Sequence, residues 1–295
     1  MTILGQSKQA RDARLAYMLI LPTVLIIAGL VFYPVIYNVW LSFHQVTTGN
    51  LGEAAAPFMG LENYRYVLRD VERFLPALRT TFIYSITGML LSLVVGLVAS
   101  LILNEQFRAR GLARGVMLFP YAAPTIAMAQ IFKWILYPNG LVNWLLMTAN
   151  IIPEPRAWLS ERGLALPAVL LFQTWKYFPF CMLMILARLQ AIDQTLYEAA
   201  EVDGANAWQR FWNITIPELQ YILLTVGLLR LIWNFNKFDD IWLLTGGSSG
   251  TMVLPVLTYQ YSFGLNNFGW GAANAMLLAL ILSVFMYFYM KETIE

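Results

Sequence analysis

Residues 195–217 read TLYEAAEVDGANAWQRFWNITIP, and this polar stretch separates two long apolar blocks of the chain. It carries too many charges to cross a lipid bilayer itself. Leu196, Ala199 and Ala200 recur at the spacing of one helix face. They predict a short amphipathic helix with a small apolar surface that is open to a partner.

A break follows this first helix at Asp203 and Gly204. Gly204 accepts backbone angles closed to other residues, and we expect the side chain of Asp203 to cap a second short helix. The second helix has three bulky apolar anchors, Trp208, Phe211 and Trp212. Pro217 suits the first turn of the span that follows, where its missing N–H costs nothing.

On both sides of this stretch the composition is that of a membrane protein. Of the 295 residues, 59% are hydrophobic and 12% are charged, compared with about 25% charged in soluble domains. The apolar residues form blocks of about 20, the length that crosses the roughly 30 Å hydrocarbon core of a bilayer. We therefore predict an all-α polytopic membrane protein with a single domain over residues 1–295 and a cytoplasmic loop at 190–216. The six predicted transmembrane helices cover residues 15–43, 78–103, 112–137, 164–189, 217–245 and 270–290.

Lysines and arginines near the helix ends orient the chain. The prediction places nine of them on the side of the termini and six on the other side. The short loop after the second helix holds Arg108, Arg110 and Arg114, whereas residues 246–267 contain neither lysine nor arginine. Because positive residues favour cytoplasmic loops, we expect both termini in the cytoplasm and the protein in a bacterial inner membrane.

Prolines and paired glycines mark places where the predicted helices depart from ideal geometry. A proline removes a backbone donor and clashes with the preceding turn, so it kinks a helix. We expect kinks at Pro34, Pro120, Pro124 and Pro179. Gly111 and Gly115 permit close approach of another helix, although their spacing also recurs by chance in apolar sequences.

The composition also argues against several functions. The net charge of +2, without a basic and aromatic patch, argues against nucleic-acid binding. The single cysteine, Cys181, lies in an apolar block and is expected to be a buried hydrophobe. The single histidine, His44, has no credible metal partner, and no serine or aspartate arrangement indicates an intramembrane protease. We expect no catalytic residue, no metal site and no cofactor on this chain.

The stretch quoted first resembles a known motif. Glu198, Ala199, Ala200, Asp203, Gly204, Ala205, Phe211, Ile214 and Pro217 stand where the cytoplasmic EAA loop of ABC-importer permeases has its signature. In that family the loop forms a coupling helix, which docks into a groove on the ATP-hydrolysing subunit. The resemblance implies that these residues couple the chain to an ATPase. The alternative is a helix lying on lipid headgroups, where Glu198, Glu201 and Asp203 would face an anionic leaflet unfavourably.

Two further stretches narrow the resemblance. Residues 234–247 resemble the fifth span of maltose-type carbohydrate permeases, and residues 60–64 resemble their external segment after the first span. Tyr221 departs from the pattern, because many members have a second proline there. The chain resembles the compact six-helix members, and this resemblance implies a type I ABC-importer permease fold.

The resemblance also implies an assembly and a cargo. Its partners are a second homologous permease subunit, two ATP-hydrolysing subunits and an external solute-binding protein, all acting at membrane lipid. No glycine-rich loop ending in glycine, lysine and serine or threonine occurs in the sequence. ATP and Mg²⁺ are therefore expected on the partner ATPase subunits. The implied function is alternating-access import of a sugar or oligosaccharide.

Polar residues inside the predicted spans are candidates for the substrate path, because a charge at bilayer depth should face a bundle interior or a cavity. The candidates are Tyr84, Gln173, Lys176, Arg230, Asn234, Asn236, Lys237 and Asp240. Other roles remain open. Asp240 would pair with Lys237, Lys176 would snorkel or bond a carbonyl of a neighbouring helix, and Arg230 would hold the subunit interface.

Two other functions remain open at this point. The same machinery would suit a polyol, glycerol phosphate, glycerol phosphodiester or sulfonated sugar, with Lys237 or Arg230 neutralising an anion. The chain would otherwise act alone as a secondary transporter. An ion-coupled carrier has no need of an EAA loop, which counts against the second alternative.

Overall fold

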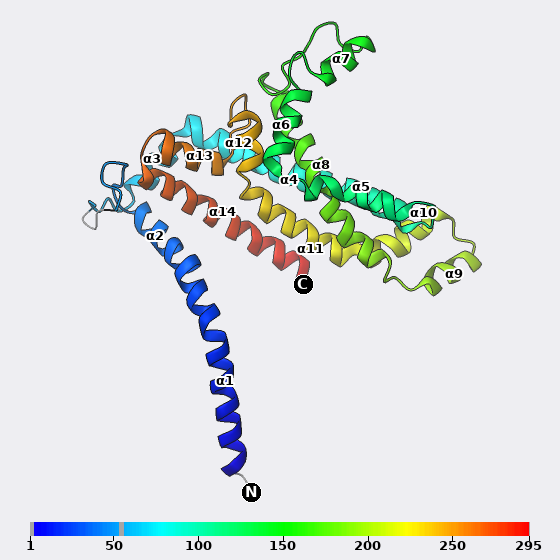
Figure 1. Cartoon of the computed structure of the whole chain (residues 1–295), viewed down its shortest axis with the longest axis horizontal. Helices are drawn as coiled ribbons and strands as arrows, with labels where there is room; N and C mark the ends of the chain where they lie inside the picture. Colours follow the sequence, from blue (N-terminus) through cyan, green and yellow to red (C-terminus); the bar gives the residue numbers. More distant parts are fainter. Residues whose placement is uncertain (1–2, 53–55, 295) are drawn as a thin grey trace. The chain divides into compact units, whose positions relative to one another are not determined.

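The computed structural model describes residues 3–52 and 56–294, and it is mostly helical (Figure 1). The α-helices are α1 (Ile3–Ile27), α2 (Tyr33–Ser42), α3 (Glu62–Arg69), α4 (Val71–Asn104), α5 (Arg110–Ala122), α6 (Thr125–Ile135), α7 (Leu141–Thr148), α8 (Ala165–Leu189), α9 (Gln194–Val202), α10 (Ala207–Arg210), α11 (Ile216–Phe235), α12 (Asp239–Thr245), α13 (Leu254–Tyr259) and α14 (Phe268–Ile294). Three π-helical turns join some of them, η1 (Ala28–Phe32), η2 (Phe211–Thr215) and η3 (Gln260–Gly264). The all-α prediction is confirmed.

Five helical stretches of the described chain are long and apolar enough to cross a bilayer. They are Asp12–Ser42, Val71–Asn104, Ala165–Leu189, Ala207–Phe235 and Phe268–Lys291. The pair α5 and α6 makes a sixth if it is taken as one broken span. This is the architecture of a polytopic membrane protein.

The predicted third span, 112–137, is not one kinked helix, because α5 and α6 are bent by 94° at the break between them. The ring of a proline pushes the residue before it out of the helical region. Ala123, which precedes Pro124, is accordingly extended, with φ −68° and ψ 144°. Pro120 lies inside α5 without interrupting it.

The predicted fifth span, 217–245, also divides. Its helix ends at Phe235, and residues 236–238 lead into α12. The side-chain amide of Asn236 donates to the carbonyl of Ile232 (2.9 Å), and this hydrogen bond closes the last turn of α11. At its other end the helix starts earlier than predicted, since a continuous helical path runs from Ala207 through η2 into α11.

Two of the π turns lie directly before prolines. The N–H of Tyr33 donates to the carbonyl of Ala28, and the N–H of Ile216 donates to that of Phe211. Pro34 and Pro217 follow immediately. In a regular α-helix the proline ring clashes with the carbonyl four residues earlier, and a wider turn relieves that clash. The irregularity expected at Pro34 is therefore a π turn.

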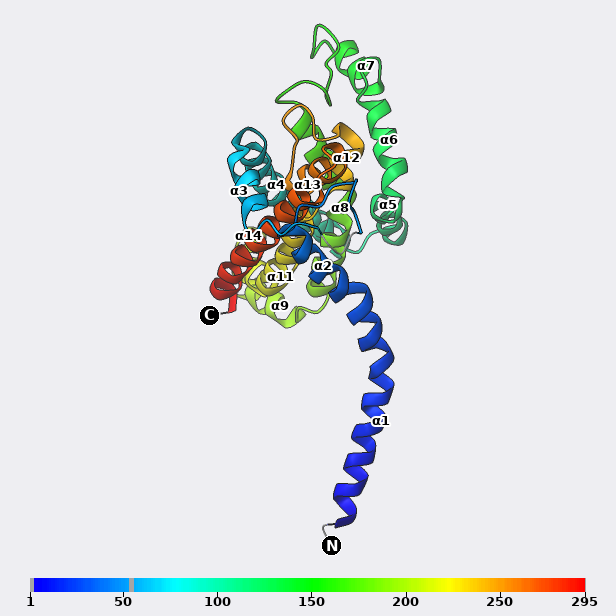
Figure 2. The same cartoon turned by 90° about the vertical axis from the view of Figure 1, so that its left-hand side faces the viewer.

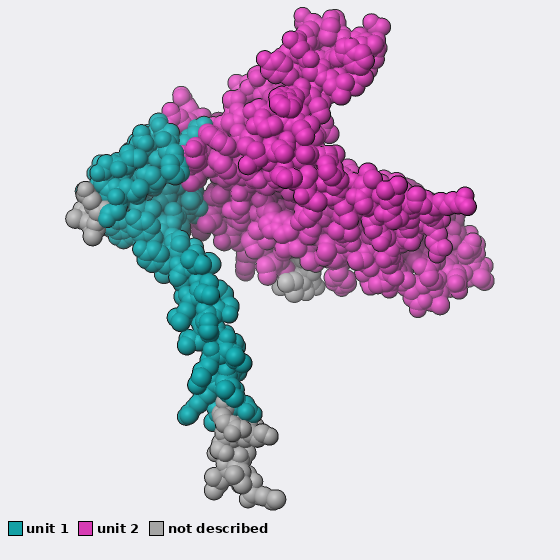
Figure 3. All heavy atoms as spheres, viewed as in Figure 1, with its two compact units in different colours: residues 1–69, 260–276 teal, residues 70–259, 277–295 magenta. Residues whose placement is uncertain are grey.

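The chain divides into two compact units, residues 1–69 with 260–276 and residues 70–259 with 277–295 (Figure 3). In the first unit, Asn63 is buried and its amide donates to the carbonyls of Ser42 and His44, each at 2.9 Å. A Cβ atom on Gly269 would lie 2.6 Å from the His44 oxygen, so glycine leaves room for this contact. The motif at 60–64 thus holds α3 against the end of α2.

In the second unit α8 lies closely against α4. A Cβ atom built on Gly88 of α4 would lie 2.0 Å from Oε1 of Gln173, and one built on Gly96 would lie 2.6 Å from Cβ of Cys181. Cys181 is fully buried there, as the sequence predicts. The glycines of α4 therefore allow the two helices to approach.

The close approach that Gly111 and Gly115 would permit is not made within the described part of this chain. No heavy atom of the described residues lies within 4 Å of a Cβ atom built on either glycine, beyond their own helix. The adjacent Leu112 and Val116 are exposed. This part of α5 faces away from the helices of its own unit.

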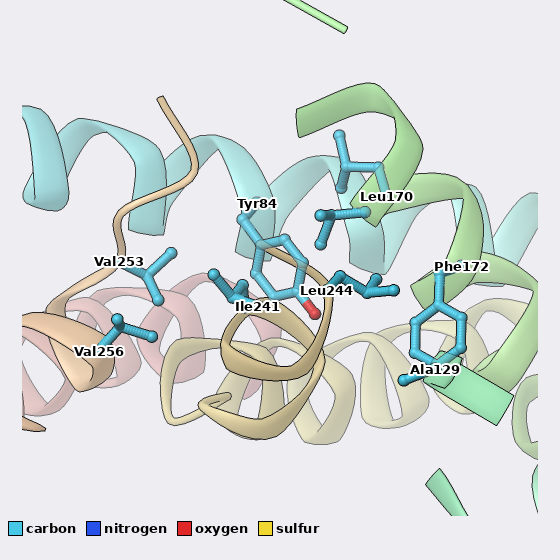
Figure 4. Packing of buried hydrophobic residues seen from close by; sticks show 9 residues of the cluster. Tyr84, Ala129, Leu170, Phe172, Ile241, Leu244, Val253 and Val256 are labelled. Atoms are coloured by element: carbon cyan, nitrogen blue, oxygen red, sulfur yellow. The ribbon is translucent and has the colours of Figure 1, made fainter. Parts of the chain in front are cut away.

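An apolar cluster joins α4, α6, α8, α12 and α13 (Figure 4). Its buried members are Tyr84, Ala129, Val169, Leu170, Phe172, Ile241, Leu244, Val253 and Val256. In a bilayer the close van der Waals packing of such side chains, rather than their removal from water, holds the short helix α12 against longer ones. Tyr84 is the member of this cluster with a hydroxyl group, and that group lies among the candidate substrate residues.

Candidate functional site

Several candidate substrate residues meet where α12 packs against α4 and α8. The hydroxyl of Tyr84 donates to Oδ2 of Asp240, and the hydroxyl of Tyr177 donates to Oδ1, each at 3.2 Å. Nζ of Lys237 lies 3.0 Å from a carboxylate oxygen of Asp239 and 3.7 Å from one of Asp240. The start of α12 is thus tied to both long helices.

A second set of contacts converges on Asn234 of α11. Its Oδ1 accepts from Nη2 of Arg230 (2.8 Å) and from Nε2 of Gln173 (3.2 Å), and its Nδ2 donates to the carbonyl of Ser85 (3.1 Å). The guanidinium carbon of Arg230 lies 4.5 Å from the centre of the Tyr177 ring, a cation–π contact. This contact joins the two sets. We call them together the polar cluster, which consists of Tyr84, Gln173, Tyr177, Arg230, Asn234, Lys237, Asp239 and Asp240.

The core of the polar cluster is closed to solvent. Asp240 is 0% exposed, and Arg230 and Asn234 are 2% exposed. Its ionic groups balance, since Arg230 and Lys237 offset Asp239 and Asp240. Burying a charge without a partner is costly, so this balance allows the cluster to lie deep in the unit. Nε of Arg230 has no hydrogen-bond partner among the described residues.

Lys176 does not join the polar cluster, although the sequence placed it with the substrate path. It is 3% exposed, and its Nζ donates to the carbonyls of Pro120 (3.0 Å) and Ala123. In a regular helix the first of these carbonyls would accept from residue 124, but Pro124 has no N–H. Lys176 therefore satisfies carbonyls that the break between α5 and α6 leaves open, which is one of the roles left open by the sequence.

Asn236 also lies apart from the other candidates. It is exposed, and its amide is used on the carbonyl of Ile232. The sequence reasoning missed Tyr177, which contacts both halves of the cluster. The signal was present, because Tyr177 follows Gln173 by four residues and so shares its helix face, whereas Lys176 points toward α5.

In the loop at 190–216, α9 has well-formed ends. The N–H of Thr195 donates to Oδ1 of Asp193 (3.0 Å), which caps the helix and lowers the pKa of that carboxyl. At the other end Gly204 has φ +80°, and the N–H of Ala205 donates to the carbonyl of Ala200 (2.9 Å). This left-handed ending is the one that glycine allows at lowest cost, as the sequence predicts.

The cap of the second short helix is Asn206, and the prediction of Asp203 was wrong. Oδ1 of Asn206 accepts from the N–H of Gln209 (3.0 Å), and Oε1 of Gln209 accepts from the N–H of Asn206 (2.8 Å). These reciprocal bonds form a capping box. Asp203 instead ends α9.

One face of α9 is apolar and uncovered by the described chain. Leu196, Ala199 and Val202 are exposed, with Val202 at 88%. Tyr197 turns inward, where its hydroxyl lies 3.0 Å from Oγ1 of Thr215. The outward face is therefore available to another protein.

The remaining motif residues divide between exposed and inner positions. Glu198 and Pro217 are exposed, whereas Ala200, Ala205 and Phe211 are half-buried. The predicted anchors Trp208 and Trp212 are also exposed, so they do not fix the second helix to this chain. Large exposed apolar side chains of this kind mark surfaces that another molecule covers.

Comparisons with known proteins agree with this arrangement. Residues 88–294 match the family described as binding-protein-dependent transport system inner membrane component. The chain is 36% identical to the trehalose/maltose transport system permease protein MalF of Thermococcus litoralis, over 95% of the chain and 94% of the relative. It is 36% identical to the inner membrane ABC transporter permease protein YcjO of Escherichia coli, over 92% of the chain and 91% of the relative.

Solved structures agree at the level of the fold. A chain of a bacterial alginate ABC transporter, in complex with alginate pentasaccharide-bound periplasmic protein, superposes with a TM-score of 0.79 at 22% identity. The superposition covers 96% of this chain and 94% of that one. The type I permease fold is therefore shared along almost the whole length. This chain belongs to the binding-protein-dependent transport system inner membrane components, the multi-pass permease subunits of ABC importers.

Proposed function

We propose that this permease forms half of the translocation path for a sugar or oligosaccharide, and that a separate ATPase drives it through residues 190–216. The observation that carries the proposal is the uncovered apolar face of α9, which is followed by a continuous helix from Ala207 to Phe235. The relatives named for trehalose, maltose and alginate support the cargo class.

A continuous series of contacts connects α9 to the polar cluster, so a movement of α9 is passed on to the cluster. An ion pair of 3.3 Å between Arg210 and Glu201 links α10 to α9. The helix that begins with α10 continues into α11, which carries Arg230 and Asn234. Arg188, near the end of α8, donates to the carbonyl of Glu218 on α11 (3.0 Å). Such linked helices transmit rigid-body rotation rather than absorbing it.

The proposed assembly has this chain, a second homologous permease, two ATP-hydrolysing subunits and an external solute-binding protein in membrane lipid. ATP and Mg²⁺ bind to the ATPase subunits, and this chain carries no cofactor. Both termini and the loop at 190–216 face the cytoplasm. The family description, which names binding-protein dependence, supports the external partner.

In this proposal the translocation path is in a closed state, and the polar cluster lies where the path is closed. Its amide and carboxylate groups bind sugar hydroxyls when α11 moves, and the unpartnered Nε of Arg230 gains an acceptor. The balanced charges of the cluster favour a neutral saccharide. Glycerol phosphate or a sulfonated sugar would add a negative charge, which the two cations and two carboxylates of the cluster would leave unbalanced.

The test is ATP hydrolysis by the complete complex in proteoliposomes with its solute-binding protein. We expect neutral sugars to stimulate hydrolysis and anionic candidates to have no effect. Glu198→Arg and Gly204→Arg should each abolish the stimulation. Uptake that is unchanged in both variants, or transport by the purified chain alone, would contradict the proposal.

A further inference from the structure

A cavity of about 720 Å³ lies in the second unit, between the end of α6, residues 157–160 and α12 with its following loop. Figures 1 and 2 both show α6 and α12 well away from α9. If α9 is cytoplasmic, as in the proposed function on which this inference rests, the cavity lies toward the external face. Its volume is within the range of about 300–1,000 Å³ that is usual for small-molecule sites.

The cavity has rigid aromatic walls over an apolar floor. Leu136 and Leu244 line it and are buried. The ring of Trp242 is 36% exposed and is held by Phe238, at 5.5 Å between ring centres, and by Tyr259, at 4.6 Å. An aromatic side chain that is fixed by its neighbours offers a flat surface to the C–H face of a sugar ring without loss of rotamer freedom.

Hydrogen-bonding groups surround these walls. The lining includes the hydroxyl residues Ser160, Thr245 and Ser248. Lys133 also lines the cavity, is half-buried, and forms no ion pair with the described residues. The hydroxyls of Thr245 and Ser248 donate to the carbonyls of Ile241 (3.0 Å) and Thr245 (2.6 Å), so toward a ligand they act as acceptors. A mixture of donors, acceptors and aromatic faces suits a polyhydroxylated ring, whereas a lipid chain would leave the ammonium group of Lys133 without a partner.

We infer that this cavity is a second saccharide site, which holds a sugar ring outside the polar cluster. The two sites share α12. Asp240 lies in the polar cluster, and Trp242, two residues further on, lines the cavity. A sugar in the cavity therefore contacts the same short helix whose start is tied to the cluster.

The test is protection of an introduced thiol in the complete complex, in nanodiscs and without the solute-binding protein. Ser248→Cys places a thiol in the lining, and Asn139→Cys places one on an exposed residue outside it. The native thiol of Cys181 is buried, so the wild-type complex serves as the blank. The probe is maltose or trehalose, whichever the complex imports.

We expect the sugar to slow maleimide labelling of Ser248→Cys about threefold at twice its dissociation constant, by mass action, and to leave Asn139→Cys unchanged. Lys133→Met or Trp242→Phe should weaken the protection at a given sugar concentration. Absence of protection in a complex that imports the sugar would overturn this inference and leave the proposed function standing. A complex that imports no sugar at all would overturn the proposed function itself.

Discussion

Gly88 of α4 and Gln173 of α8 lie in direct contact, so that a Cβ atom on Gly88 would come within 2.0 Å of Oε1 of Gln173. The amide nitrogen of the same glutamine donates to Oδ1 of Asn234 on α11 at 3.2 Å. One side chain therefore belongs both to the packing of α4 on α8 and to the polar cluster. Because residue 88 is glycine, there is room for the side chain of Gln173 to reach Asn234 in the polar cluster.

Alanine at the two contact glycines should destabilise the chain. Gly88→Ala displaces Gln173 from Asn234, and in Gly96→Ala the new methyl meets the backbone nitrogen of Met182 at 2.9 Å. Overpacking of this kind costs about 1–3 kcal/mol, with the larger loss at residue 96 because backbone cannot move aside. Thermal unfolding of the purified chain in detergent measures it. The control Gly111→Ala, which meets no other side chain, should not lower stability, and equal stability of all three variants would contradict the packing.

Lys176→Met should lower stability without changing cargo recognition. The change leaves the carbonyls of Pro120 and Ala123 without their donor, and a buried unsatisfied group costs about 1–3 kcal/mol. Unfolding in detergent and the KM for sugar-stimulated ATP hydrolysis are measured together. Lys133→Met is the matched control for stability, since this lysine is half-buried but makes no hydrogen bond with the described residues. Wild-type stability with a raised KM would instead make Lys176 a cargo ligand.

Gly204→Ala should uncouple ATP hydrolysis from cargo. Gly204 has φ +80°, and alanine in the left-handed region costs about 1–2 kcal/mol, which distorts the end of α9. Gly163→Ala is the matched control, because Gly163 has φ +99° but lies outside the loop at 190–216. Both variants carry backbone strain, but only Gly204→Ala should reduce sugar-stimulated ATP hydrolysis. An equal loss in the two would indicate general destabilisation.

Asn63→Ala should loosen the junction of α2 and α3. The variant removes the donor shared by the carbonyls of Ser42 and His44. We expect faster amide hydrogen exchange over residues 62–69, because a buried group that loses its partner favours local opening. The control Asn139→Ala changes an exposed asparagine. Exchange that is unchanged in Asn63→Ala would show that the amide does not hold this junction.

Features that depend on local sequence could be predicted. Of the two features of this kind in the loop at 190–216, the glycine at the end of α9 was predicted correctly and the cap of α10 was not. Gly204 was recognisable because its backbone angles are a local requirement. Asp203 and Asn206 are both good caps, and the choice between them depends on Gln209 three residues after Asn206. Because Gln209 stands in the sequence at the position a capping box requires, the choice of Asn206 depends on local sequence alone.

Features set by contacts between distant segments could not be derived in the same way. The break at residues 236–238 contains neither proline nor glycine, and α12 is held instead by bonds from Tyr84 and Tyr177 to Asp240. The partner of Lys176 likewise lies on another helix, more than 50 residues away in sequence. Periodicity identified residues suited to a polar interior, but it could not show which of them meet.

Val202→Arg provides the most direct test of coupling through α9. Val202 is 88% exposed in this chain and should be buried by the ATPase subunit. An unpaired charge in such an interface costs about 3–5 kcal/mol, so we expect sugar-stimulated ATP hydrolysis in proteoliposomes to fall at least about tenfold. Gln220→Arg, which adds the same charge on the exposed surface of α11, should retain stimulation. Wild-type stimulation in Val202→Arg would contradict the account.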